Sequence, residues 1–191
     1  MQEKQYQPIV GKDIFLRLAT ENDAPFLFDL RSNAKNKFVH PVDDYSSHCA
    51  WLRKTCSRHD DYFFIVTEGK TGIPLGTVSI YNIDFIKSNA EIGRWVMVEK
   101  SRLGFAAVEL AYKFAFDIIK LNTVYAEVVT ENKPVMAFHL ACGLEKTESP
   151  FTCIVLRGQN YYLQQLFATR EMWPKIQANI NKFICMMEKP Q

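Results

Sequence analysis

The hydrophobic pattern of this chain changes repeatedly between a period of two residues and a period near 3.6. This alternation limits the fold more than any other feature. Segments with the short period, or with short apolar runs, are expected to be strands at residues 14–18, 62–67, 75–82, 90–98, 124–129, 152–157 and 161–168. Segments with the longer period are expected to be helices through residues 26–30, 46–56, 102–120, 132–142 and 174–187. Such an order predicts the α/β (α+β) class, with a mixed central sheet of about seven strands and helices on both faces.

Capping residues mark several of the expected helix ends. Asn132 stands where a helix N-cap is expected, and Gly143 stands where that helix would end. Ser46 or Ser47 is expected near the start of the second helix. We find no boundary within the chain, so residues 1–191 are predicted to form one domain. Its core spans about 13–173, and 174–191 form a C-terminal amphipathic helix.

Composition excludes several classes of protein. The formal charge is +2, which argues against a general nucleic-acid binder, whose affinity would rest on many phosphate contacts. No apolar run approaches the roughly 18 residues of a membrane span, and the start of the chain has no apolar signal segment, so we expect no membrane partner and a cytoplasmic location. The five cysteines include no C-x-x-C pair, and the histidines show no metal spacing, so reduced thiols and no metal site are expected.

The junction between an expected strand and the longest expected helix, at residues 98–107 (VEKSRLGFAA), is the most informative stretch. The unpaired N–H groups and the dipole of a helix N-terminus favour a bound phosphate. Gly104 would let the backbone approach a ligand, and Lys100 and Arg102 would add positive charge. An ordinary strand-to-helix turn explains this stretch about equally well when it is taken alone.

Further features resemble the GNAT acetyltransferases. That family has a Q/R-x-x-G-x-G/A loop that binds the pyrophosphate of CoA, and this sequence offers Ser101-x-x-Gly104-x-Ala106. The segments EIGRW (91–95) and NKPVMAFHLACGL (132–144) also resemble the family, with His139 where relatives carry Tyr. The resemblance covers about residues 14–173. It is nearest to the branch of ribosomal-protein N-terminal and nucleotide-amino-sugar N-acetyltransferases.

The resemblance implies a mostly antiparallel sheet that splays between its fourth and fifth strands to hold acetyl-CoA. The pantetheine arm would hydrogen-bond the backbone of Val96, Met97 and Val98, and Asn132 would contact the same arm. The thioester would point toward Glu91 and His139. The pyrophosphate would lie on Arg102, Leu103, Gly104, Phe105, Ala106 and Ala107.

Acyl transfer to an amine needs a base for the amine and benefits from an acid for the leaving thiolate. Glu91 is the preferred base, with Glu127 as a second candidate. His139 is the candidate acid, because it lies two helical turns after Asn132 and an ordinary imidazole titrates near pH 6.5. Each has a plain structural alternative: a salt-bridged strand residue for Glu91, a packed helix residue for His139, and an N-cap for Asn132.

The sequence thus predicts acetyl transfer from acetyl-CoA to the primary amine of a small acceptor, by direct attack on the thioester. A nucleotide-linked amino sugar is the favoured kind of acceptor. One alternative is acetylation of a protein N-terminus, such as that of a ribosomal protein. A second alternative, of another class, is a non-catalytic CoA-binding or interaction module. A homodimer is left open.

Overall fold

The strands of the molecule form one mixed sheet. In the computed structural model, residues 6–42, 44–98, 101, 103–148 and 152–188 are described. Within them the strands are β1 (Ile9–Val10), β2 (Ile14–Leu18), β3 (Tyr62–Glu68), β4 (Pro74–Asp84), β5 (Asn89–Met97), β6 (Thr123–Val129), β7 (Glu145–Lys146), β8 (Thr152–Leu156) and β9 (Gln159–Thr169). Their order across the sheet is β1-β2-β3-β4-β5-β6-β9-β7, and β8 pairs with β9 beside this path. The pair β5–β6 is parallel, and the other pairs are antiparallel.

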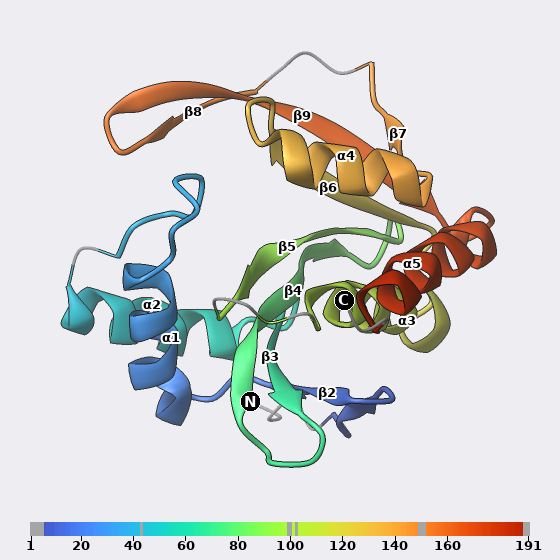
Figure 1. Cartoon of the computed structure of the whole chain (residues 1–191). Coiled ribbons are helices and arrows are strands. Elements are labelled where there is room, and N and C mark those ends of the chain that lie inside the picture. The colour runs from blue at the N-terminus through green and yellow to red at the C-terminus, as the bar shows by residue number, and fades with distance from the viewer. Residues whose placement is uncertain (1–5, 43, 99–100, 102, 149–151, 189–191) are drawn as a thin grey trace.

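Helices cover both faces of this sheet. They are α1 (Ala24–Ser32), α2 (Tyr45–Ser57), α3 (Gly104–Lys113), α4 (Lys133–Cys142) and α5 (Trp173–Glu188). A 3-10 turn, η1 (Glu21–Asp23), precedes α1, and a π-helical segment, η2 (Phe114–Ile118), continues α3. In Figure 1, α1 and α2 lie on one side of the sheet, and α3 with α5 lies on the other. The predicted class, a largely antiparallel mixed sheet with helices on both faces and a C-terminal helix, is confirmed.

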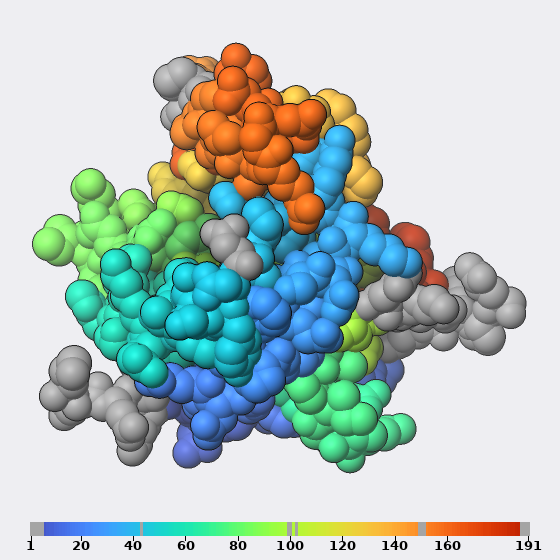
Figure 2. Space-filling model, turned by 90° about the vertical axis from the view of Figure 1, so that its left-hand side faces the viewer, coloured from blue at the N-terminus to red at the C-terminus, as the bar shows by residue number. Residues whose placement is uncertain are grey.

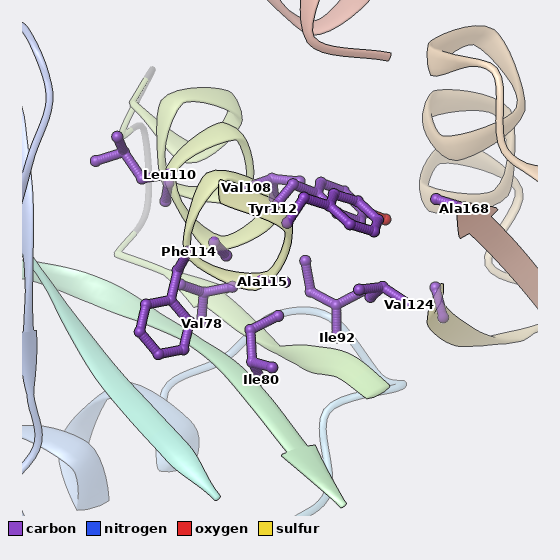
Figure 3. Packing of buried hydrophobic residues seen from close by; sticks show 14 of the residues in the cluster. Val78, Ile80, Ile92, Val108, Leu110, Tyr112, Phe114, Ala115, Val124 and Ala168 are labelled. Carbon is purple, nitrogen blue, oxygen red and sulfur yellow. The ribbon is translucent and has the colours of Figure 1, made fainter. Parts of the chain in front are cut away.

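The alternation of side chains along β3 produces these two layers. Phe63 and Ile65 pack with α1 and α2 in one buried cluster. Phe64 and Val66 point the other way, into the larger cluster that includes α3. Figure 3 shows that larger cluster, where Tyr112 of α3 and neighbouring apolar side chains rest on β4, β5 and β6. Full burial of each large apolar side chain contributes about 1.5–3 kcal/mol, so this layer fixes α3 against the sheet.

Several element ends differ from the sequence expectation. The helix expected from residue 102 begins at Gly104 and changes to π-helical geometry at Phe114. Helix α2 begins one residue earlier than expected, because the Asp44 carboxylate, rather than a serine, caps it by accepting the backbone N–H of Ser47 at 2.9 Å. Two strands of two residues, β1 and β7, add to the seven expected. They are too short to carry an alternating pattern.

Candidate active site

The sheet opens where β5 and β6 stop pairing. These parallel strands pair from Asn89 with Thr123 to Glu91 with Tyr125. Beyond that point β5 stays paired with β4, and β6 stays paired with β9. The facing edges of β5 and β6 therefore separate, and residues of both strands line a cavity of about 730 Å³.

A bulge in β5 accompanies this opening. The register between β4 and β5 shifts between Thr77 and Ser79, and Arg94 has a positive φ of 50°. The Thr77 hydroxyl donates to the Arg94 carbonyl at 2.6 Å. The Arg94 guanidinium binds the fully buried Asp61 carboxylate with contacts of 2.8 and 2.9 Å. These contacts hold a backbone conformation that a residue with a side chain adopts rarely, and bulges bend strands in this way.

The end of β5 offers backbone groups to the opening. The Val98 N–H donates to the Leu75 carbonyl at 2.8 Å, and Met97 is the next residue back, opposite Gly76. Hydrogen bonding alternates along an antiparallel pair, so the peptide groups of Met97 face away from β4. Val96 lines the cavity. The expected cofactor strand therefore has its free edge on the cavity side.

Helix α3 begins beside this strand end. A Cβ on Gly104 would meet the side chains of Trp95 and Met97 at 3.3 Å, so a larger residue would crowd both. The N-cap residue, Leu103, makes no side-chain cap, although its own N–H donates to the Ser101 hydroxyl at 3.4 Å. Ser101, which departs from the family pattern, thus supports the loop locally.

The rest of the expected pyrophosphate loop divides between packing and the helix start. Phe105 stacks on Phe138 of α4 with ring centroids 4.8 Å apart. Ala107 is fully buried, and Ala106 is partly buried. Arg102, also expected to bind the cofactor, lies outside the described residues.

Helix α4 forms another wall of the cavity, which both Asn132 and His139 line. Asn132 occupies the N-cap position, but its side chain makes no capping hydrogen bond. Gly143 ends the helix in the left-handed conformation, with φ of 105°, as the sequence predicts. Asn132 therefore lies at the helix start, and its side-chain amide is not used in a capping hydrogen bond.

His139 is nearly enclosed, with 6% of its surface exposed, and its Nδ1 has no hydrogen-bond partner in the described part of the chain. Trp95 and Phe138 lie against it, with ring centroids 6.5 and 5.3 Å away. Burial lowers the pKa of His139 to about 4. The imidazole is therefore neutral at pH 7, and the expectation of an ordinary imidazole pKa near 6.5 is wrong.

The two candidate bases take different positions. Glu127 lines the cavity, and both burial and the nearby charge of Glu91 raise its pKa. Glu91 lies at the last position where β5 pairs with β6, and its Oε1 accepts the Asn82 amide at 3.0 Å. Together with burial, its charge raises the pKa of Tyr81. Glu91 does not line the cavity in the described part of the chain. Its position before the opening follows from where β5–β6 pairing ends, which no local pattern reveals.

Sequence reasoning missed a group of cavity residues on the α1–α2 side. They share aromatic or cationic side chains, and they are Arg31, His48, Trp51, Tyr81 and Arg94. Arg94 lies in EIGRW (91–95), where the sequence signal pointed only to family resemblance. Tyr81 lies over Gly93, since a Cβ there would be 2.9 Å from the tyrosine hydroxyl oxygen. Burial and the nearby Glu91 raise the pKa of Tyr81.

Described residues of the connection between α1 and α2 line this side of the cavity. Phe38 in that connection contacts Tyr161 of β9 edge to face, with centroids 5.5 Å apart. Figure 2 shows the connection, in light blue, reaching the β8–β9 hairpin in orange. Phe38 also packs in a small cluster with Leu156 and Val129. This side of the cavity is consequently built from elements far apart in the sequence.

Comparison with known proteins fits this geometry. The model of the acetyltransferase (GNAT) domain matches residues 13–145, well over half of the chain. The chain belongs to the GNAT acetyltransferase family. The spermidine N(1)-acetyltransferase of Vibrio cholerae is 22% identical over 139 residues, which cover 70% of this chain and 80% of that protein. The family expected from the sequence is confirmed, and the chain is an acetyl-CoA-dependent N-acetyltransferase.

Solved GNAT structures share the fold along most of the chain. FdhC, described as a nucleotide-linked sugar GNAT, has a TM-score of 0.74 at 23% identity and covers 90% of this chain and 95% of that one. A Vibrio cholerae protein provisionally designated a ribosomal-protein-serine acetyltransferase has a TM-score of 0.72 at 20% identity, with 88% and 99% covered. Both kinds of protein named in the sequence expectation are thus among the structural neighbours. At these identities the likeness concerns the fold.

The described residues of this GNAT protein were compared with the requirements of a membrane span and of a metal site by their helix lengths and side-chain groupings. No helix among them is long and apolar enough to cross a membrane. No group of three or more His, Cys, Asp or Glu side chains within the described ranges is placed to hold a metal ion.

Proposed function

We propose that this GNAT protein transfers the acetyl group of acetyl-CoA to the primary amine of a small acceptor, with a nucleotide-linked amino sugar as the favoured class. The observation that carries the proposal is the opening between β5 and β6. The opening runs along the end of β5, where Trp95 and Met97 lie against Gly104 at the start of α3, and it leads into a cavity with cationic and aromatic side chains. A donor and an acceptor can meet there from opposite sides.

The residues present fit acetyl-CoA. Met97 would hydrogen-bond the pantetheine arm through its free peptide groups, next to Val96 and Val98. The segment from Leu103 to Ala107, with Arg102 before it, would hold the pyrophosphate at the start of α3, where the N-cap residue makes no side-chain cap. Asn132 has its amide free of the cap and lines the cavity, so it suits a contact with the same arm. When bound, acetyl-CoA supplies an activated acyl group.

A carboxylate on β5 or β6 would remove the proton of the acceptor amine. Glu127 is our preferred base, because it lines the cavity and has a raised pKa, which brings it nearer to the working pH of a general base. Glu91 would act through its charge, which adds to burial in raising the pKa values of Glu127 and Tyr81, and it is held by the Asn82 amide. Glu91 as the direct base stays an alternative, which variants of the two residues separate.

His139 would stabilise the leaving sulfur. A neutral imidazole carries one N–H, and at this buried position the N–H can donate a hydrogen bond to a thiolate without a charge having to be desolvated. This differs from donation by an imidazolium, which the ordinary pKa would allow.

Because the α1–α2 connection lines the cavity and contacts β9 through Phe38 and Tyr161, a small acceptor is favoured over a protein N-terminus. Calorimetry with CoA, followed by thiol release against a panel of amines and peptides, tests the proposal. We expect CoA binding and release of CoA with an amino sugar or a nucleotide-linked amino sugar. Turnover with peptides alone would favour N-terminal acetylation. CoA binding without turnover on any amine would favour a non-catalytic module.

A further inference from the structure

The wall of the cavity formed by α1 and α2 holds more positive than negative charge. Arg31 and Arg94 both lie beside the Trp51 ring, with guanidinium carbons 5.0 and 5.7 Å from its centroid. Asp61 binds Arg94. Arg31 donates to the His40 carbonyl at 3.2 Å, and it has no carboxylate partner in the described ranges. Among the described residues, the Arg94 charge is thus compensated by Asp61, and the Arg31 charge has no such partner.

The carboxylates that line the cavity in the described part of the chain make no ion pair with Arg31. Asp44 lines the same cavity, but its oxygens accept the N–H and hydroxyl of Ser47 at 2.9 and 2.6 Å. Glu127 lines it from β6, where burial and the charge of Glu91 raise its pKa. Burial and the charge of Arg94 both lower the pKa of Arg31, so the guanidinium lies where its charge is costly.

A buried polar group accompanies the two arginines. His48 of α2 lines the cavity and is 3% exposed, and its Nε2 has no hydrogen-bond partner in the part of the chain that the structure describes. Its ring stacks on Trp51, with centroids 5.6 Å apart. Burial and the Arg31 charge lower the pKa of His48. Trp51 therefore has three nitrogen-bearing side chains around its ring, and no carboxylate within the described ranges pairs with Arg31.

We propose that Arg31, supported by Arg94, Trp51 and His48, binds an anionic oxygen group of the acceptor, either a phosphate or a carboxylate. A guanidinium presents a planar fork of donors that matches both groups. The acceptor is then an amine that carries negative charge at a distance from its amino group. A polyamine, which is cationic throughout, would meet repulsion from Arg31. The site differs in this respect from what a spermidine-binding protein needs.

The inference rests on the proposed function only in assigning the anion to the acceptor, and its test does not need turnover. The protein is saturated with CoA, so that the phosphate positions of the cofactor are filled. Inorganic pyrophosphate and malonate are then titrated separately by calorimetry. The variants are Arg31→Gln and Arg31→Lys. The control is Arg53→Gln, which removes the same charge from an exposed position of α2 where Arg53 pairs with Glu21. CoA affinity and a thermal melt confirm that each variant is folded.

We expect at least one of the two anions to bind, Arg31→Gln to weaken it about tenfold or more, and Arg31→Lys to weaken it less. Arg53→Gln should bind as the unchanged protein does. The anion that binds with the higher affinity shows whether the site prefers a phosphate or a carboxylate. Binding of neither anion, or equal weakening by Arg31→Gln and Arg53→Gln, would overturn the inference.

An activity measurement separates this inference from the proposed function. The preference for glucosamine 1-phosphate over glucosamine in kcat/KM should fall at least about tenfold in Arg31→Gln. If anion binding depends on Arg31 but no amine is acetylated, the proposed function fails and the anion site stands. If amines are acetylated with no such preference and spermidine is the best substrate, the anion site fails and the proposed function stands.

Discussion

At the residue scale, His139 shows how burial changes the chemistry that a side chain can supply. An imidazole with an ordinary pKa near 6.5 would be partly protonated near neutral pH. Enclosed by Trp95 and Phe138, His139 has a pKa of about 4 instead. It can therefore donate from a neutral ring across the physiological range, and its protonation imposes no pH limit there.

Replacing His139 by Phe tests this state. The pKa of His139 is lower in the folded protein than in the unfolded chain, so the unfolded chain binds more protons between about pH 6.5 and about pH 4. His139 therefore destabilises the folded protein progressively as the pH falls through that window. The variant should gain thermal stability relative to the unchanged protein as the pH is lowered from 7 to 5. Its kcat should fall at least about tenfold, because the N–H donor to the sulfur is lost.

The control is His59→Phe, at an exposed position outside the cavity. Thermal melts and kcat are measured for all three proteins from pH 5 to 9. A His139→Phe protein with unchanged kcat at every pH would make His139 a packing residue only. A kcat loss confined to the region below pH 7 would mean that imidazolium, and not the neutral ring, is the active form.

Glu127 is the second residue whose role depends on its surroundings. A base works in its deprotonated form, so kcat/KM should fall as the pH drops through the raised pKa of Glu127. Glu127→Gln should lower kcat/KM about a hundredfold or more at pH 8 and remove this acidic limb. Glu131→Gln, at the β6–α4 connection and outside the cavity lining, is the matched control. An acidic limb that survives in Glu127→Gln and disappears in Glu91→Gln would assign the base to Glu91.

At the element scale, the start of α3 depends on a residue without a side chain. Gly104→Glu would place a carboxylate against Trp95 and Met97 and beside the expected pyrophosphate, where like charges repel. CoA affinity should fall at least about tenfold. Gly104→Ala, whose methyl group meets the same neighbours at 3.3 Å without charge, should weaken CoA less. Calorimetry measures both, and a folded Gly104→Glu protein with unchanged CoA affinity would disprove this placement of the phosphates.

Elements with long, regular patterns could be predicted from the sequence, and details that depend on contacts between elements could not. The apolar spacing through α3 and the Asn132-to-Gly143 frame of α4 gave correct elements, because each is a local signal. The two-residue strands β1 and β7 exist only through pairing with β2 and β9. The positions of Glu91 and Glu127 relative to the cavity follow from the length of β5–β6 pairing, which is set by the whole sheet.

The same reason explains why the sequence did not predict the wall of the cavity on the α1–α2 side. Arg31 and Trp51 lie on different helices, and Arg94 lies on β5. Their meeting requires the α1–α2 layer to pack on the sheet face that Phe63 and Ile65 provide. Sequence spacing within one helix cannot show such a meeting.

At the scale of the whole molecule, the reaction should proceed without a covalent acetyl-enzyme. All five cysteines are described and none lines the cavity. Cys142, the buried one, has its pKa raised to about 12 by desolvation, so it holds little thiolate at neutral pH. Initial-rate measurements should give intersecting, sequential kinetics. Parallel-line kinetics, together with an acetyl-cysteine that forms without acceptor and passes its acetyl group on, would contradict this expectation.

The three-position pairing of β5 with β6 has a further consequence for how the protein can change. The lateral joint between the two halves of the sheet is short at the place where the cavity opens. Substitutions that lengthened this joint would add backbone hydrogen bonds and raise the melting temperature, yet they would seal the opening that a donor must enter. Thermostability and catalysis therefore place opposite demands on the β5–β6 pairing. Selection for a more thermostable protein would instead favour substitutions in the α1–α2 layer or around α5.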